Sequence, residues 1–136
     1  NNNIGYSYLN YFNQPDSAMP YYQKALEIAI EQENSSLEAA VLNNLARIHE
    51  VNGDNESAKQ NLLRALDLNY QLNDLSNAAN IHHRLASIFN KEQDFKLAVY
   101  HVQKGEATLG EIKNIESNES HMYFLYISTV SACIFL

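Results

Sequence analysis

Apolar residues recur along this chain at steps of three and four, the spacing that places side chains on one face of an α-helix. Between residues 40 and 68 this pattern occurs twice, on either side of a short polar stretch at residues 52–55. The apolar positions are Ala40, Val41, Leu45 and Ile48 before that stretch, and Ala58, Leu62, Ala65, Leu66 and Leu68 after it. Gly53 fits the positive φ at a helix C-terminus, and Asp54 or Asn55 fits the N-cap of a second helix. The pattern therefore predicts two amphipathic helices joined by a tight turn.

The whole arrangement repeats with a fixed period. Two series of residues are spaced 40 positions apart: Ala18, Ala58 and Ala98, and Leu45, Leu85 and Leu125. A period of this size is typical of stacked repeat proteins. Ala46 and Ala58 are small, which suits the point where the two helices of a pair cross closely. We therefore expect an all-α fold built from antiparallel helix pairs.

These units resemble the tetratricopeptide repeat. That family pairs an L-G-x-x-Y run on its first helix with an A-x-x-x-F run and a further Ala on its second. The first run is matched by Ile4, Gly5 and Tyr8, by Leu45, Ala46 and His49, and by Leu85, Ala86 and Phe89. The second run is matched by Ala18, Tyr22 and Ala25, by Ala58, Leu62 and Ala65, and by Ala98, Val102 and Gly105. The resemblance implies a right-handed superhelix.

The expected organisation is a single helical repeat domain over residues 1–136, with units at about 1–36, 37–76 and 77–116 and a terminal helix at 117–136. The family unit has about 34 residues, and the additional residues here fall near 29–36, 69–76 and 109–116, which predicts longer second helices. Gly105 stands where the family has Ala, and we expect a following helix to approach it closely. The chain does not begin with Met, so we expect a fragment of a longer protein.

Composition narrows the possible partners. The net charge is −7, and the nine Lys and Arg residues are scattered, which argues against direct nucleic-acid binding. Only four Gly and two Pro occur, as expected for an all-helical domain. The single cysteine, Cys133, excludes an internal disulfide.

Residues 122–136 form a run of 15 without a charge. One interpretation is a repeat or capping helix, because Leu125 keeps the repeat phase. Another is the onset of a membrane span, although a span needs about 20 residues. A third is a dimer contact through Tyr123, Phe124 and Ile127. The compartment stays open: cytoplasmic, or extracytoplasmic if this run begins a span.

No catalytic or cofactor motif stands out. The sequence has no H-E-x-x-H, no phosphate-binding glycine loop and no G-x-S-x-G. His82 and His83 are adjacent on a helix and point about 100° apart, which is poor geometry for holding one metal ion. We therefore expect no enzyme activity, no cofactor and no metal.

The resemblance also implies where a ligand binds. In the family the first helices line a concave face, and their contacting side chains recur at fixed offsets. Carried over by phase, these positions are Asn2 and Tyr6 in the first unit, Asn43, Arg47 and Glu50 in the second, and Asn80, His83, Ser87 and Asn90 in the third. The function expected is a scaffold that binds a protein or peptide segment.

Two alternatives stay open. One is a sensory or regulatory domain of a membrane-anchored bacterial signalling protein, with a kinase or transcription regulator as output. The other is a self-association module, a homodimer formed through the C-terminal apolar helix.

Overall fold

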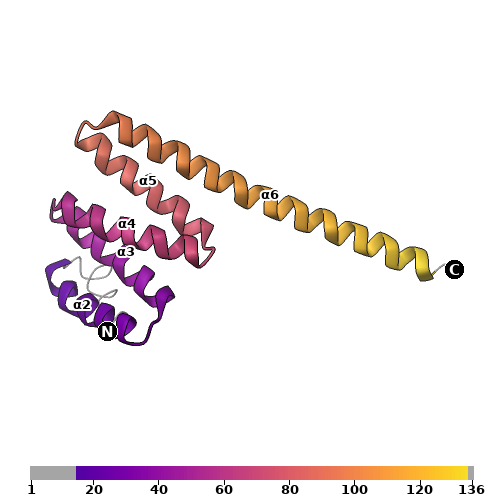
Figure 1. Cartoon of the computed structure of the whole chain (residues 1–136), viewed down its shortest axis with the longest axis horizontal. Coiled ribbons are helices and arrows are strands. Elements are labelled where there is room, and N and C mark those ends of the chain that lie inside the picture. Colours follow the sequence, from indigo (N-terminus) through magenta and orange to yellow (C-terminus); the bar gives the residue numbers. More distant parts are fainter. Residues whose placement is uncertain (1–14, 135–136) are drawn as a thin grey trace.

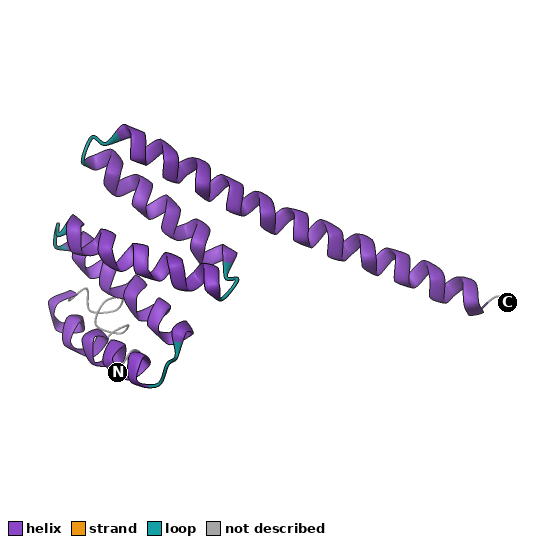
Figure 2. Cartoon of the chain, in the orientation of Figure 1, coloured by secondary structure: helices purple, strands orange, loops and turns teal. Residues whose placement is uncertain are grey.

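The computed structural model describes residues 15–134, and it describes side chains over residues 17–119. In the described part five α-helices follow one another, and no strand occurs. They are α2 (Pro15–Glu31), α3 (Ser35–Val51), α4 (Asn55–Gln71), α5 (Leu75–Lys91) and α6 (Phe95–Ile134). Figure 2 shows helices joined only by short loops.

Each turn between helices has the same construction. Its middle residue has a positive φ: Glu33 at 50°, Gly53 at 76°, Asn73 at 56° and Gln93 at 63°. The next residue, Asn34, Asp54, Asp74 or Asp94, accepts a hydrogen bond from the backbone N–H three positions on, at 3.0–3.2 Å. The same residue donates its own N–H to a carbonyl five positions back, at 2.8–2.9 Å. These bonds satisfy orphan groups at both helix ends, and they confirm the prediction for Gly53 and Asp54.

Successive helices pack against one another in chain order, α2 on α3, α3 on α4, α4 on α5 and α5 on α6. Figure 1 shows this stack, with α6 running along α5 and then beyond the other helices. Ala46 and Ala58, the small residues expected at a helix crossing, are completely buried. Leu42, Leu62 and Ile81 lie in the same core cluster and are also buried. The predicted all-α solenoid of antiparallel helix pairs is confirmed.

The second helices were expected to be longer than in the usual unit of the family. In the structure α2, α3, α4 and α5 each have 17 residues. The additional residues of the 40-residue unit are thus shared equally between both helices.

The last helix, α6, does not end where the repeat phase places the next turn. Residues 112–114 stand one repeat period after the turn at 72–74. The helix α6 nevertheless continues through them and has 40 residues in all. The boundary expected between residues 116 and 117 lies inside this helix. None of the described residues forms a helix long and apolar enough to cross a membrane.

Gly105 lies against the preceding helix, not a following one. A Cβ added to it would lie 3.4 Å from His82 Cβ and 3.5 Å from the Ala79 carbonyl oxygen, both on α5. The small residue therefore lets α5 and α6 approach closely, so the expected close contact exists but with the other neighbour.

Candidate functional site

The described candidate residues lie on two first helices, α3 and α5. Arg47, Asn80, His83, Ser87 and Asn90 are exposed, whereas Asn43 and Glu50 are half-buried. Asn2 and Tyr6 lie outside the described residues. Tyr123, Phe124 and Ile127 lie in the last part of α6, where side chains are outside the described range.

Asn43 and Glu50 are held by a side chain of the next unit. The Arg84 guanidinium on α5 donates to Glu50 Oε1 from Nε at 3.1 Å and from a terminal nitrogen at 2.6 Å. Its other terminal nitrogen donates to the Asn43 carbonyl oxygen at 3.3 Å and to the Asn43 side-chain oxygen. Asn43 and Glu50, which the repeat phase assigns to the ligand-binding concave face, therefore help to hold α5 near α3.

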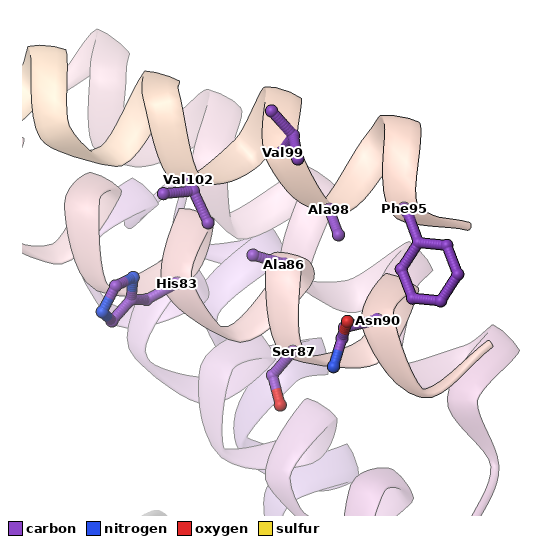
Figure 3. A pocket seen from close by; sticks show the side chains of 8 residues that line it. All are labelled: His83, Ala86, Ser87, Asn90, Phe95, Ala98, Val99 and Val102. Atoms are coloured by element: carbon purple, nitrogen blue, oxygen red, sulfur yellow. The ribbon is translucent and has the colours of Figure 1, made fainter. Parts of the chain in front are cut away.

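His83, Ser87 and Asn90 come together in a groove at the end of the array. Its volume is about 440 Å³, and it is lined by His83, Ala86, Ser87 and Asn90 of α5 and by Phe95, Ala98, Val99 and Val102 of α6. Figure 3 shows the α5 side chains along one edge and the α6 side chains along the other. The structure thus brings together three of the four third-unit candidates.

The α6 edge of this groove was missed by the sequence reasoning. Phe95 and Val99 are large apolar side chains that are 60% and 54% exposed. Forty positions earlier the chain has Asn55 and Lys59, so a polar residue gives way to an apolar one at both places. That change within the repeat is the signal that could have found them. No Asp, Glu, Lys or Arg lines the groove, so apolar contact dominates its chemistry.

A buried polar network lies elsewhere, between α4, α5 and α6. His82 Nδ1 and His101 Nδ1 are 2.9 Å apart, and both residues are buried. The Tyr70 hydroxyl lies 3.0 Å from His82 Nε2 and 3.1 Å from Thr108 Oγ1. The Phe89 ring stacks on His101, with ring centres 5.4 Å apart.

The hydrogen bonds of the network determine which atom carries each proton. The Thr108 hydroxyl donates to the Lys104 carbonyl oxygen at 2.9 Å, so it accepts from the Tyr70 hydroxyl. The Tyr70 oxygen then accepts from His82 Nε2–H, which leaves His82 Nδ1 to accept from His101 Nδ1–H. A single direction of donation therefore accounts for all four of these hydrogen bonds.

Both imidazoles in this network are held neutral. Burial lowers the pKa of His82 to about 4, with His101 and Lys104 adding to the effect. Burial also lowers the pKa of His101. Within the described residues no group of three or more His, Cys, Asp or Glu side chains could hold a metal ion. The hydrogen bonds of the network join α4, α5 and α6.

Comparisons with known proteins agree with this architecture. A model of the tetratricopeptide repeat family matches residues 1–71, more than half of the 136-residue chain. The solved structure of BtubC (BKLC) from P. vanneervenii is similar, with a TM-score of 0.75 and 21% identity over 82% of this chain and 46% of that one.

The likeness to BtubC concerns the fold alone, and this chain spans less than half of its length. No curated protein sequence is similar enough to count as a match. The repeat period, the stacked helix pairs and the family match all lead to one conclusion: the chain belongs to the tetratricopeptide repeat family.

Proposed function

We propose that this chain is a non-catalytic scaffold that binds a segment of another protein in the groove between α5 and α6. The observation that carries the proposal is the exposed apolar edge of that groove, formed by Phe95, Val99 and Val102. Large apolar side chains grouped on a surface mark interaction sites. Membership of the tetratricopeptide repeat family supports the same function, since such domains typically bind proteins.

The two edges of the groove have different tasks in this proposal. Covering a large apolar side chain contributes about 1.5–3 kcal/mol, so Phe95, Val99 and Val102 supply most of the affinity. Each hydrogen bond to Ser87 or Asn90 adds only about 1 kcal/mol, so the α5 edge mainly fixes the position of the ligand.

A displayed library of natural protein segments tests this function. We expect segments that bind the wild-type chain to lose binding to Val99→Glu, which places a charge on the apolar edge. The matched control is Leu63→Glu on α4, because Leu63 is a similarly exposed apolar residue that does not line the groove. A library without binders, or binders that tolerate Val99→Glu as well as they tolerate Leu63→Glu, would contradict the proposal.

Self-association along α6 is a second candidate function. Leu109 and Ile115 are exposed on α6 beyond the groove, and the helix then continues into the segment that carries Tyr123, Phe124 and Ile127. Light scattering over a wide concentration range tests it. A dimer that Phe124→Asp converts to a monomer with unchanged helicity would support this function, and a monomer at every concentration would exclude it.

A further inference from the structure

The groove corresponds, by the repeat, to a surface that is already occupied in the preceding unit. Shifted back by 40 positions, its apolar residues Ala86, Ala98 and Val102 become Ala46, Ala58 and Leu62. All three of these earlier residues are completely buried, in the core cluster that also contains Ile81, Leu85 and Ile88 of α5. In the second unit, therefore, a helix occupies the position that is an open groove in the third.

In the described part of the chain no further helix fills this groove. In the other turns the backbone reverses direction after three residues, but α6 continues straight through residues 112–114. Figure 1 shows α6 leading away from the stack, so in the described part of the chain no helix returns to cover α5 and α6. The groove is a continuation of the internal helix–helix interface that no other described helix covers.

The floor of the groove suits a helical ligand better than an extended one. Ala86 and Ala98 are small and repeat Ala46 and Ala58, over which α5 packs closely. A helix satisfies its own backbone hydrogen bonds, whereas an extended segment leaves unpaired N–H and C=O groups. Only Ser87, Asn90 and His83 could pair with them, and all three lie on the α5 edge.

The rim of the groove has lost the charges that hold α5 in the second unit. There Arg84 bonds to Glu50, and Lys59 pairs with Glu92 at 2.9 Å. The third unit has Asn90 in place of Glu50 and Val99 in place of Lys59. A helix that occupies the groove therefore finds no carboxylate for an arginine and no ammonium for a glutamate.

We propose that the groove binds an amphipathic α-helix of a partner protein, which takes the place on α5 and α6 that α5 takes on α3 and α4. This inference rests on the proposed function and specifies its ligand. The helix carries apolar residues at the spacing of Ile81, Leu85 and Ile88 and a small residue at the Ala78 position. It carries an uncharged residue where α5 has Arg84, and its binding depends little on salt because no charged residue lines the groove.

The chain supplies its own probe for this proposal. Two labelled peptides, one with the α5 sequence 75–92 and one with the same sequence and Arg84→Leu, are titrated against the whole chain by fluorescence anisotropy. We expect the Arg84→Leu peptide to bind about tenfold more tightly than the peptide with the unchanged α5 sequence, because the unchanged peptide buries an arginine without a partner. Circular dichroism should show that the peptide gains helix on binding, and Leu85→Asp in the peptide should abolish binding.

A groove variant provides the reciprocal test. Asn90→Glu combined with Val99→Lys restores the two charges of the second unit. The restored carboxylate should reverse the preference in favour of the peptide that keeps Arg84, whereas the restored ammonium meets Glu92, which both peptides carry. Leu63→Glu, outside the groove, should leave the preference for the Arg84→Leu peptide unchanged.

The peptide experiments overturn the inference if neither peptide binds, if binding occurs without gain of helix, or if the groove variant leaves the preference unchanged. A dimer that Val99→Glu dissociates would also overturn it, because a second copy would then occupy the groove. If the segment library of the preceding section yields groove binders that stay extended, the inference falls while the scaffold function stands. If neither library nor peptide binds, both fall.

Discussion

Arg84 joins two helices that do not follow one another along the chain. It lies on α5, and its bonds to Asn43 and Glu50 reach α3, one helix further than the packing of α5 on α4. The side chains of Arg84 and Glu50 are only 25% and 27% exposed, so water weakens their attraction less than it weakens that of a surface pair. No counterpart exists one unit earlier, where the chain has Asn44.

Removing the Arg84 guanidinium should therefore destabilise the array. We expect Arg84→Met to lower the free energy of unfolding by about 2 kcal/mol, because it leaves the half-buried Glu50 carboxylate without its donors. Urea unfolding of the wild type, Arg84→Met, Glu50→Gln and the double variant gives the coupling energy directly. Additive effects of the two substitutions would show that the pair contributes nothing of its own.

The buried histidines should make stability depend on pH. The folded chain keeps His82 neutral, with a pKa lowered by burial to about 4, whereas the unfolded chain protonates it near the ordinary value of 6.5. The unfolded state thus binds more protons between these pH values, so stability is full above pH 6.5 and falls as pH decreases toward 4. The His82 pKa alone corresponds to a loss of about 2 kcal/mol at pH 5 relative to pH 7.5, and the lowered pKa of His101 acts in the same direction.

Urea unfolding at pH 7.5, 6 and 5 measures this effect. The double variant His82→Gln, His101→Gln should show a much flatter dependence, because glutamine keeps polar groups but does not titrate. His83→Gln is the matched control, since His83 is exposed and should leave the slope as it is in the wild type. Equal slopes in the wild type and the double variant would assign the pH dependence to other groups.

At the scale of the element, the three-residue turn is the feature that all four helix connections share. Its middle position needs a positive φ, which suits glycine and costs other residues about 1–2 kcal/mol. Only Gly53 meets this need without cost, while Glu33 and Gln93 hold the same conformation with a Cβ. The turns at these two residues are therefore less stable than they could be.

Glycine at those positions should stabilise the fold. We expect Glu33→Gly and Gln93→Gly each to raise the free energy of unfolding by about 0.5–1 kcal/mol, since strain is removed from the folded state although the unfolded chain gains freedom. Glu33→Ala is the matched control and should change little, because alanine keeps the Cβ. Urea midpoints distinguish the variants, and a destabilised Gln93→Gly would mean that its side chain, not its backbone, matters.

Some features of the helices and turns could be predicted from the sequence, and others could not. The Gly53 turn, the Asp54 cap and the buried alanines follow from local chemistry, because backbone conformation and helix crossing need those residue types. The continuation of α6 does not follow, since Asn114 stands in phase with the cap residue Asn34. Whether a chain turns at such a place depends on whether a further helix packs there, and no local pattern contains that information.

The same reasoning explains what was missed at the candidate site. His83, Ser87 and Asn90 were found because polar residues on an amphipathic helix point away from its own core. Phe95 and Val99 were not, because an apolar residue in a repeat is normally covered by the next helix. The change from Asn55 and Lys59 to Phe95 and Val99 is visible in the sequence, but the exposure of these two side chains is seen only in the tertiary structure of the described residues.

At the scale of the whole molecule, backbone packing among the described residues connects only helices that follow one another in sequence. An array of this kind behaves as a line of units, each stabilised by its neighbours. Damage at one end should therefore stay local, whereas damage in the middle should spread.

Amide hydrogen exchange tests this view. Tyr22→Ala in α2 removes a fully buried aromatic ring and should speed exchange in α2 and α3 while leaving α5 and α6 protected. Leu62→Ala in α4 should cost about 2–5 kcal/mol and speed exchange on both sides of it. Uniformly faster exchange in the Tyr22→Ala chain would show instead that the array unfolds as one cooperative body.

The side-chain bonds that skip a helix have a mechanical consequence. Arg84 links α5 to α3, and Tyr70 links α4 to α6 through Thr108, so the later part of the stack is fastened across its layers. Under tension applied at the two ends of the chain, α2 should peel away at low force, since in the described residues it packs only on α3. The helices α3 to α6 should unfold later, at a higher force and together, so a pulling experiment should show two separate unfolding events.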